Sequence, residues 1–366
     1  MTDRKRICFF SGDITRSGGT EKVSAQIMNA LCDDYDVFVV SLTEEAEKPF
    51  YAINDSVARA SLFESSPDGM TRYFAIVRRL RRFLRAKRID LLIDIDTVLD
   101  IFSVPAVRGL GVKLAAWEHF SFYETMGTRI RMPIRKHFTR KVDAVVTLTR
   151  EDKDYFTRAF RGQTRVVQIY NPIIFPRISA EYDDHSKTIV SIGRLAKQKG
   201  VDYLIETAET VFARHPDWEW LILGEGEERQ TLEAMLAERQ LRQVRLIGRV
   251  ANVEDYLSES AIFVLTSRYE GFPLALVEAK AMGLPAVSFR CRTGPSELIE
   301  DGVNGFLIDC FHVEQMAEKI CELIEDSGKR IAFSQRALDD TDRMNYSYIV
   351  SQWKSLLDDL LSDVSR

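Results

Sequence analysis

The sequence predicts an α/β protein made of two doubly wound domains, each built on a parallel sheet. With 366 residues, 45% of them hydrophobic and 29% charged, the chain is long enough for two separate cores. Short apolar runs alternate with amphipathic stretches in both halves. The alternation stops at Asn171-Pro172 and then begins again, so we expect a first domain over residues 1–171 and a second over residues 172–345.

The first domain is expected to contain a Rossmann-like sheet. Short apolar runs predict its strands, in chain order, at residues 6–12, 36–42, 90–96, 113–117, 143–149 and 165–170. Segments between several of these strands have helical periodicity, among them residues 21–31. The second domain repeats the pattern, with strands predicted at residues 187–193, 218–224, 244–248, 261–267, 284–289 and 305–308.

Two prolines and a terminal helix define how the domains connect. Pro172 and Pro176 break regular structure between them and predict a hinge. Because open α/β sheets bind ligands beyond the carboxyl ends of their strands, we expect the site in a cleft between the domains. The amphipathic stretch from about Tyr346 to Leu361 fits a helix on either domain, and we assign residues 346–366 to the first.

Composition restricts the class of protein. The five cysteines are scattered and include no C-x-x-C pair, which favours a reducing compartment and argues against structural zinc. No apolar run approaches the roughly 18 residues that a membrane span needs, and residues 1–10 have a strand pattern rather than that of a signal peptide. We therefore expect a cytoplasmic protein.

The charge is unevenly distributed along the chain. Residues 1–165 carry 28 Lys and Arg against 22 Asp and Glu, a net charge of +6, whereas residues 166–366 carry 22 against 33, a net charge of −11. The two halves are thus expected to face different partners. The overall net charge of −5 lacks the basic excess of most nucleic-acid-binding proteins, so we expect no nucleic-acid partner.

The segment EGFPLALVE, residues 270–278, combines a helix start with two acids. A helix is predicted from about Leu274, with Glu270 on the loop before it and Glu278 near its N-terminal end. The N–H groups and partial positive charge of such an end suit a phosphate, and the acids can accept hydrogen bonds from sugar hydroxyls. A nucleotide sugar offers both groups; the alternative is that Glu278 is an ordinary surface acid.

A second candidate is GRLAKQKG, residues 193–200, directly after a predicted strand. Arg194 and Lys199 stand on the loop that leads to the next helix, and Gly193 and Gly200 let backbone approach a ligand. Arg can bind two oxygens at once and Lys supplies a point charge, so the loop suits a diphosphate. A solvated basic loop is the alternative.

A glycine pair, Gly18-Gly19, follows the first predicted strand and precedes the helix expected over residues 21–31. It does not form a G-x-G-x-x-G fingerprint, so a dinucleotide-binding motif is absent from this position. The pair therefore predicts either a tight turn or a close approach of backbone to a donor phosphate or sugar.

Four segments in this order and spacing, GRLAKQKG, LILGEGEER, EGFPLALVEAKAMGLPAV and DGVNGFLI, resemble the retaining glycosyltransferases of family 4. The resemblance covers essentially the whole chain and is strongest in the second half. It implies the GT-B fold, in which two Rossmann-like domains face a central cleft. The N-terminal domain is then expected to bind the acceptor and the C-terminal domain the nucleotide sugar.

The resemblance also implies roles for single residues. Arg194 and Lys199 hold the donor diphosphate. Glu270 binds the hydroxyls of the donor sugar, and Glu278 binds the nucleotide ribose. The remaining contacts to sugar, phosphate and base come from Gly271, Phe272, Pro273 and Arg249.

Sugar transfer requires stabilisation of the charge that grows on the departing nucleoside diphosphate. Arg194, Lys199 and the helix start after Glu270 supply this without a metal ion, so we expect neither metal nor cofactor. The D-x-D pair Asp94 and Asp96 would hold a divalent ion in another glycosyltransferase fold. Here it ends a strand of the first domain, and we interpret it as lining of the cleft.

His119 follows the strand predicted at residues 113–117. By the resemblance it sits beside the donor sugar, where it positions hydroxyls or supports the transition state rather than abstracting a proton; a purely structural histidine is the alternative. No residue identifies a covalent nucleophile, so retention follows from family membership alone. The loop from Arg290 to Pro295 differs in charge from the more acidic version in related polysaccharide enzymes, which leaves the donor sugar open.

A basic amphipathic helix is predicted from Arg72 to Arg88. Its apolar face consists of Tyr73, Val77, Leu80 and Leu84, and its basic face of Arg78, Arg81, Arg82 and Arg85. A second basic group consists of Arg129, Arg131, Arg135, Lys136, Arg140 and Lys141. These cations are expected to bind an anionic membrane surface or the diphosphate of a polyprenyl-linked acceptor, unless they form only a solvated face.

Together these features favour a retaining hexosyltransferase that moves a hexose or N-acetylhexosamine from a UDP-sugar to a glycan acceptor. We expect a lipid-linked acceptor, a role in bacterial-type surface polysaccharide or oligosaccharide assembly, and a peripheral location on the inner face of the cytoplasmic membrane. One alternative is a sugar-nucleotide epimerase of the same architecture, which needs no acceptor. Another is a non-catalytic nucleotide-sugar-binding subunit, which binds donor without turnover.

Overall fold

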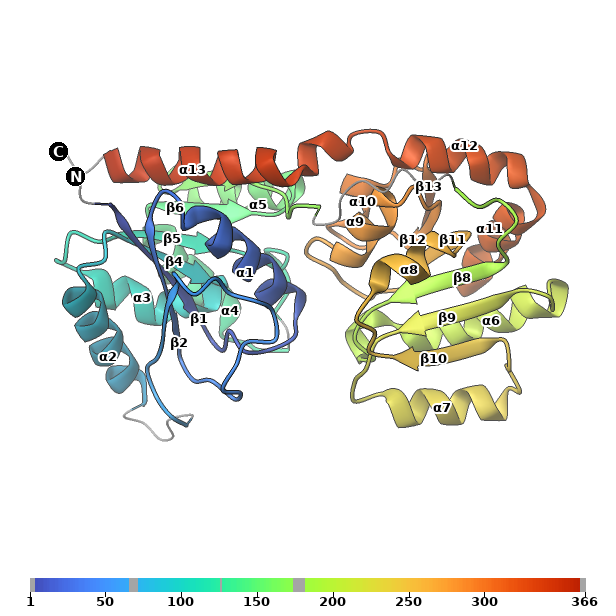
Figure 1. Ribbon diagram of the computed structural model, residues 1–366, viewed down its shortest axis with the longest axis horizontal. Coiled ribbons are helices and arrows are strands. Elements are labelled where there is room, and N and C mark those ends of the chain that lie inside the picture. Colours follow the sequence, from blue (N-terminus) through green and yellow to red (C-terminus); the bar gives the residue numbers. More distant parts are fainter. Residues whose placement is uncertain (1–3, 66–71, 126, 174–181, 363–366) are drawn as a thin grey trace. The chain divides into compact units, whose positions relative to one another are not determined.

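The computed structural model describes residues 4–65, 72–125, 127–173 and 182–362. The chain divides into two compact units, Met1–Pro172 with Tyr346–Arg366, and Ile173–Asn345. Each unit contains one parallel sheet covered by helices (Figure 1). Pro176, which we expected at the hinge, lies outside the described residues.

The sheet of the first unit has seven strands in the order β3-β2-β1-β4-β5-β6-β7. They are β1 (Arg6–Ser11), β2 (Asp36–Ser41), β3 (Ala58–Ser61), β4 (Leu91–Ile95), β5 (Lys113–Trp117), β6 (Ala144–Thr147) and β7 (Arg165–Gln168). Every strand that we predicted in this half is confirmed. The prediction missed β3, because this edge strand is largely exposed and its sequence, ARAS, contains no apolar run.

The helices of the first unit pack on the two faces of its sheet. They are α1 (Gly19–Leu31), α2 (Arg72–Lys87), α3 (Asp100–Val107), α4 (Arg131–His137), α5 (Arg150–Phe160) and α13 (Tyr346–Ser362), with 3-10 turns η1 (Thr97–Leu99) and η2 (Thr139–Lys141). Helices α2 and α3 lie against each other, and α13 packs on α1. The Tyr35 hydroxyl donates to Asp358 at 2.5 Å, and Lys354 Nζ lies 2.5 Å from Asp34. The last helix therefore belongs to the first unit.

The second unit has six strands in the order β10-β9-β8-β11-β12-β13. They are β8 (Thr188–Ile192), β9 (Glu219–Leu223), β10 (Val244–Gly248), β11 (Ile262–Leu265), β12 (Ala286–Phe289) and β13 (Gly305–Ile308). Its helices are α6 (Val201–Arg214), α7 (Arg229–Glu238), α8 (Val253–Ser258), α9 (Leu274–Ala281), α10 (Pro295–Leu298), α11 (Val313–Glu325) and α12 (Ser327–Ala337), with 3-10 turns η3 (Lys197–Lys199) and η4 (Thr341–Met344). All strands predicted in this half are confirmed.

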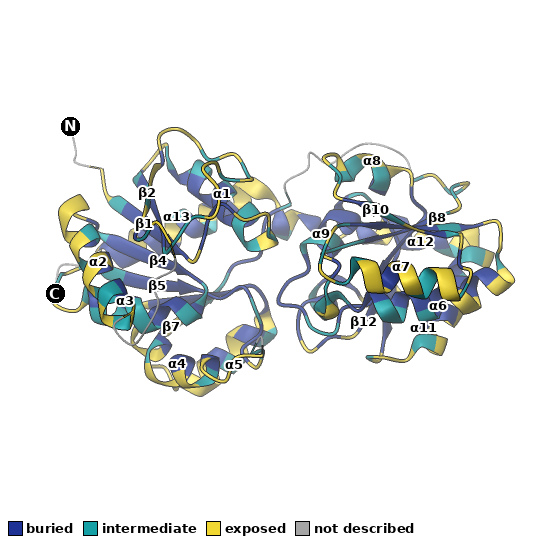
Figure 2. Cartoon of the chain, turned by 90° about the horizontal axis from the view of Figure 1, so that it is seen from below, coloured by how far each residue is buried: buried dark blue, intermediate teal, exposed yellow. Residues whose placement is uncertain are grey.

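The central strands are apolar because they are buried on both faces, as expected for parallel sheets between helices (Figure 2). Exposed residues gather instead on the outer faces of helices such as α2 and α7. In both sheets the strand order reverses beside the first strand, between β1 and β4 and between β8 and β11. Loops that follow these strands border the crevice where doubly wound folds bind ligands.

Candidate functional site

Lys199 and Glu270 meet at the carboxyl edge of the second sheet. Lys199 ends η3 after β8 and Glu270 lies on the loop after β11, so the pair flanks the point where the strand order reverses. Lys199 Nζ lies 2.6 Å from Glu270 Oε1, which also accepts the Ser267 hydroxyl at 2.6 Å. The Glu270 side chain is only 6% exposed and that of Lys199 is 21% exposed. The site therefore holds a largely buried ion pair whose lysine is the partner that solvent or ligand reaches.

Two glycines allow the loops of this site to touch through their backbones. Gly200 has a φ of +63°, and a Cβ there would lie 2.1 Å from the Thr266 carbonyl oxygen. Gly294 has a φ of +96°, and its Cβ would lie 3.0 Å from the Gly271 carbonyl oxygen. Both conformations and both close approaches favour glycine. The loop of Lys199 and the loop of Glu270 are thus positioned by direct main-chain contact.

The helix that follows Glu270 begins at Leu274, as predicted, with Pro273 as its N-cap. Gly271, Phe272 and Pro273 are all buried, so they offer backbone rather than side chain to a ligand. The first N–H groups of a helix have no partner inside it, which leaves the start of α9 able to bind an anion.

The predicted position of Glu278 near the N-terminal end of this helix is wrong. Because α9 starts at Leu274, Glu278 lies more than one turn inside it, beyond the first turn in which the helix dipole acts. Glu278 is also only 7% exposed, which excludes the alternative of an ordinary surface acid. Its contact with a ribose remains a prediction.

Arg194 does not contact the Lys199–Glu270 ion pair. Its side chain is 72% exposed and lies 2.9 Å from Glu227. Exposed ion pairs contribute little to stability, so Arg194 can exchange Glu227 for another anion at small cost. Arg249 follows β10, the edge strand of the sheet, and is exposed. The roles of Arg194 at the diphosphate and of Arg249 at the base remain predictions.

Gly18, Gly19 and His119 belong to the first unit. Gly18 is the N-cap of α1 and Gly19 its first residue, after the loop that follows β1. A Cβ on Gly18 would lie 2.3 Å from Glu21 Oε2, and the Glu21 carboxylate accepts the Gly18 N–H. An acid of the chain itself thus occupies this helix start.

His119 lies just beyond the end of β5 and is 7% exposed. Its ring packs on Trp117, with 4.4 Å between ring centroids. Burial lowers the pKa of His119 to about 3, so the ring is neutral near neutral pH. Its Nε2 has no hydrogen-bond partner among the described residues. A neutral ring can position a hydroxyl, which agrees with the role expected for His119, although that role is untested.

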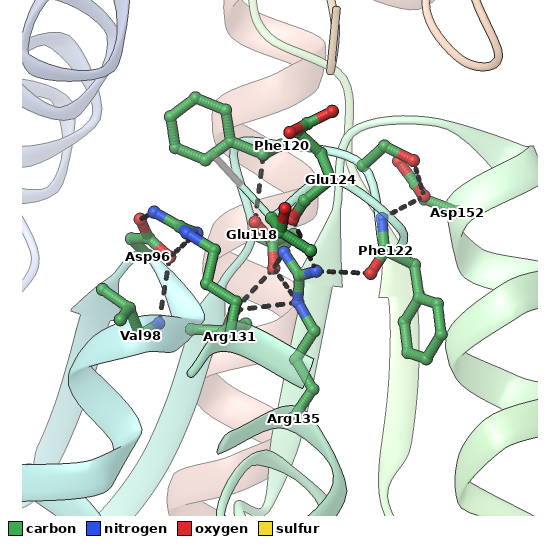
Figure 3. A network of polar contacts seen from close by, with 12 residues as sticks. Asp96, Val98, Glu118, Phe120, Phe122, Glu124, Arg131, Arg135 and Asp152 are labelled. Atoms are coloured by element: carbon green, nitrogen blue, oxygen red, sulfur yellow. Dashed lines mark hydrogen bonds and ion pairs between the residues drawn. The ribbon is translucent and has the colours of Figure 1, made fainter. Parts of the chain in front are cut away.

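The loop that carries His119 is held by a buried polar network (Figure 3). Arg135 of α4 is fully buried and lies 2.8 Å from Glu118 Oε2. It also donates to the carbonyl oxygens of Phe122 and Glu124. From α5, Asp152 accepts the Phe122 N–H at 2.8 Å. The backbone from residue 118 to residue 124 is therefore fixed by charged groups on two helices.

Asp94 does not line a surface, contrary to our interpretation of the D-x-D pair, whereas the Asp96 side chain is 14% exposed and its place at a cleft remains a prediction. Asp94 is fully buried, and burial raises its pKa to about 7. Asp94 accepts a hydrogen bond from Ser103 at 2.6 Å. Asp96 is bound by both terminal nitrogens of Arg131, at 2.9 and 2.7 Å. Within the described residues, no cluster of three or more His, Cys, Asp or Glu is arranged to hold a metal ion.

The basic surface is smaller than predicted. Arg131 and Arg135 do not belong to it, because both are buried and paired with acids. Arg81 donates to the carbonyl oxygens of Ala106 and Arg108. The exposed cations that remain are Arg78, Arg82, Arg85, Arg129, Lys136, Arg140 and Lys141. Among the described helices, none has the length and apolarity needed to cross a bilayer.

Sequence reasoning missed several residues that build these sites. In the second unit, Ser267 binds Glu270, and the Thr293 hydroxyl donates to the Glu270 carbonyl oxygen at 2.7 Å. Their positions at a strand end and before Gly294 were the only signal. In the first unit, a pocket of about 250 Å³ lies beside the fixed loop. It is lined by Phe122, Tyr123, Tyr155, Arg158 and Ala159.

Comparisons with known proteins agree with this architecture. Residues 17–174 match the family described as Glycosyltransferase Family 4, and residues 176–340 match the family described as Glycosyl transferases group 1. The solved structure of the pneumococcal O-GlcNAc transferase GtfA in complex with UDP and GlcNAc superposes with a TM-score of 0.82 at 15% identity. It covers 98% of this chain and 99% of that one.

Two relatives match almost from end to end. The Campylobacter jejuni enzyme GalNAc-alpha-(1->4)-GalNAc-alpha-(1->3)-diNAcBac-PP-undecaprenol alpha-1,4-N-acetyl-D-galactosaminyltransferase is 27% identical over 93% of this chain and 95% of its own. A glycosyltransferase of Haemophilus influenzae, itself uncharacterised, is 32% identical over 96% of this chain and 100% of its own. On this identity and coverage, the chain belongs to the family 4-like glycosyltransferases, with the GT-B fold.

Proposed function

We propose that this glycosyltransferase is a retaining enzyme that moves a hexose or N-acetylhexosamine from a UDP-sugar to a glycan acceptor. The observation that carries the proposal is the Lys199–Glu270 pair at the strand-order reversal of the second sheet, beside the start of α9. A buried carboxylate, a reachable cation and a helix start are the groups that bind a sugar, a diphosphate and its developing charge. The UDP and GlcNAc bound to the pneumococcal structure support a donor of this kind.

In the proposed reaction, the sugar hydroxyls hydrogen-bond to Glu270 while the ammonium group of Lys199 forms an ion pair with the diphosphate. As the bond between sugar and diphosphate breaks, Lys199 and the first N–H groups of α9 stabilise the negative charge on the leaving group. The proposal requires no metal ion. His119, neutral through burial, contributes hydrogen bonds rather than a proton.

A panel of UDP-, GDP- and ADP-linked sugars tests the donor. A ligand that binds only the folded protein raises its melting temperature by mass action, so we expect selective stabilisation by one UDP-sugar. That donor should then release UDP in the presence of a glycan acceptor, with the anomeric configuration of the sugar kept in the product. An epimerised sugar nucleotide formed without acceptor would support the epimerase instead, and binding without turnover would support a non-catalytic subunit.

We further propose that the acceptor is lipid-linked, as part of bacterial-type surface polysaccharide or oligosaccharide assembly, and that the first unit docks on an anionic membrane surface. The name of the Campylobacter jejuni relative, which contains an undecaprenol diphosphate, supports the acceptor. The exposed arginines of α2 support the docking, because each cation near an anionic surface contributes about 1 kcal/mol.

Flotation with vesicles that contain phosphatidylserine is expected to carry the protein with the lipid at low salt and not at high salt, because salt screens exposed charges. The triple variant Arg78→Ala/Arg82→Ala/Arg85→Ala should remain at the bottom of the gradient. A triple variant of exposed cations in the second unit, Lys187→Ala/Arg214→Ala/Arg245→Ala, is the matched control and should float. Equal flotation of both variants would contradict the proposal that the arginines of α2 bind the anionic membrane surface.

A further inference from the structure

Cys291 and Cys310 lie next to each other at the carboxyl edge of the second sheet. Strands β12 and β13 pair in parallel with Phe289 opposite Ile308, and each cysteine follows its strand residue by two positions. The Arg290 N–H donates to the Ile308 carbonyl oxygen at 2.6 Å, so the pairing continues past the strand ends. The Cys310 thiol donates to the carbonyl oxygen of Arg290, the residue before Cys291, at 3.3 Å, so the two side chains lie beside each other.

The two thiols differ in environment. Cys291 is 3% exposed, and its Sγ lies 3.0 Å from the Ser267 carbonyl oxygen. Cys310 is partly exposed at the surface. The interaction between the two side chains lowers the pKa of Cys310 to about 7 and raises the pKa of Cys291. Cys310 is therefore the accessible thiolate of the pair, and Cys291 is the protonated thiol held against it.

We propose that Cys291 and Cys310 form a redox-sensitive site that closes to a disulfide when the protein meets a peroxide. The Cys310 thiolate attacks one oxygen of hydrogen peroxide, the O–O bond breaks, and hydroxide leaves, which takes up a proton to become water. The Cys291 sulfur then attacks the resulting sulfenic acid. The S–S bond forms as the S–O bond breaks, and the proton of Cys291 leaves with the hydroxide as a second water. A thiol reductant reverses the oxidation.

The disulfide would affect the proposed donor site through Ser267, which contacts both Cys291 and Glu270. Its carbonyl oxygen accepts the Cys291 thiol, and its hydroxyl donates to Glu270 Oε1 at 2.6 Å. Oxidation removes the S–H donor and draws Cys291 toward Cys310, so the loop that presents Glu270 loses one of its anchors. Binding of the donor sugar should weaken as a result. This consequence rests on the proposed function, whereas the oxidation itself does not.

The test is a titration of the reduced protein with hydrogen peroxide, followed by peptide mapping and by thiol counting before and after dithiothreitol. We expect loss of two thiols, a peptide cross-linked between residues 291 and 310, and recovery with dithiothreitol. Cys310→Ser and Cys291→Ser should form no intramolecular disulfide. Cys32→Ser is the matched control, because the Cys32 thiol also lies near a carbonyl oxygen, at 3.2 Å from that of Met28. It should behave as wild type, since it leaves Cys291 and Cys310 in place. A cross-link that persists in Cys310→Ser, or its absence from wild type, overturns the proposal.

If a variant fails to fold, alkylation of the wild-type protein tests whether Cys310 is the reactive thiolate. Iodoacetamide should label Cys310 faster than Cys32 at neutral pH, and slower labelling would contradict a thiolate at position 310. Donor-induced thermal stabilisation, measured before and after oxidation, separates the two proposals. No stabilisation of the reduced protein by any UDP-sugar would refute the proposed donor and leave the thiol site standing. Equal stabilisation of both forms, with the disulfide present, would refute the link through Ser267.

Discussion

The Lys199→Met variant is expected to lose about 10²- to 10³-fold in kcat/KM with the UDP-sugar donor, the usual effect of removing one preorganised group that stabilises developing charge. Lys199 is the cation that contacts Glu270 on the loop before α9, whereas Arg194 pairs with Glu227. Initial rates of UDP release at several donor concentrations measure the effect. Lys187→Met is the matched control: this lysine precedes the opposite end of β8, is exposed, and pairs with Asp217 at 2.6 Å.

Loss of Lys199 also leaves a buried carboxylate without its cation, which by itself destabilises a protein. The double variant Lys199→Met/Glu270→Gln removes that charge and should recover stability without recovering activity. Near-wild-type kcat/KM in Lys199→Met would reject a role for the lysine at the diphosphate. Recovery of activity in the double variant would show that the pair only supports the fold.

Replacing Arg135 by Met is expected to lower the free energy of unfolding of the first unit by about 3–5 kcal/mol, the range for breaking a buried ion pair by removing one partner. Both side chains of the Arg135–Glu118 pair are fully buried. The substitution also leaves the carbonyl oxygens of Phe122 and Glu124 without a donor from α4. Urea unfolding, followed by tryptophan fluorescence, measures the loss.

The neighbouring variant Lys136→Met serves as the control, since this side chain is exposed on the same helix and its loss should change stability little. Glu118→Gln/Arg135→Met should be more stable than Arg135→Met alone, because no unpaired charge stays buried. A loss well below 1 kcal/mol in Arg135→Met would mean that water reaches this network, contrary to the burial of both partners.

The strands were predictable because burial on two faces demands apolar residues, and the helix start at Leu274 was predictable because the preceding proline cannot lie in a helix interior. Edge strand β3 was not, since exposure leaves no such pattern. Arg131 and Arg135 were misplaced for the opposite reason: arginine is usually exposed, and only the folded chain brings Asp96 and Glu118 to them. Local spacing cannot reveal a partner so far away in the sequence.

The donor-side pair illustrates the same limit. The sequence indicated Lys199 and Glu270 as separate candidates for phosphate and sugar, each from its own loop. Their direct contact depends on two strands that are neighbours only because the order of the sheet reverses between them. Arg194, five positions before Lys199 on the same loop, looked equivalent in the sequence but is exposed and bound to Glu227.

At Gly200 and Gly294 two loops are in direct backbone contact, so no side chain lies between them that could be replaced by a shorter or longer one. Neither turn has room for an added methyl group, because the Thr266 carbonyl oxygen lies at that place beside Gly200, and the Pro273 ring and the Gly271 carbonyl oxygen lie close to it beside Gly294. Diversification of sugar preference on this scaffold should therefore proceed by exchanging outward-pointing side chains rather than by changing turn lengths. For protein engineers, libraries over such side chains are the better choice, and insertions beside the two glycines should mostly abolish folding.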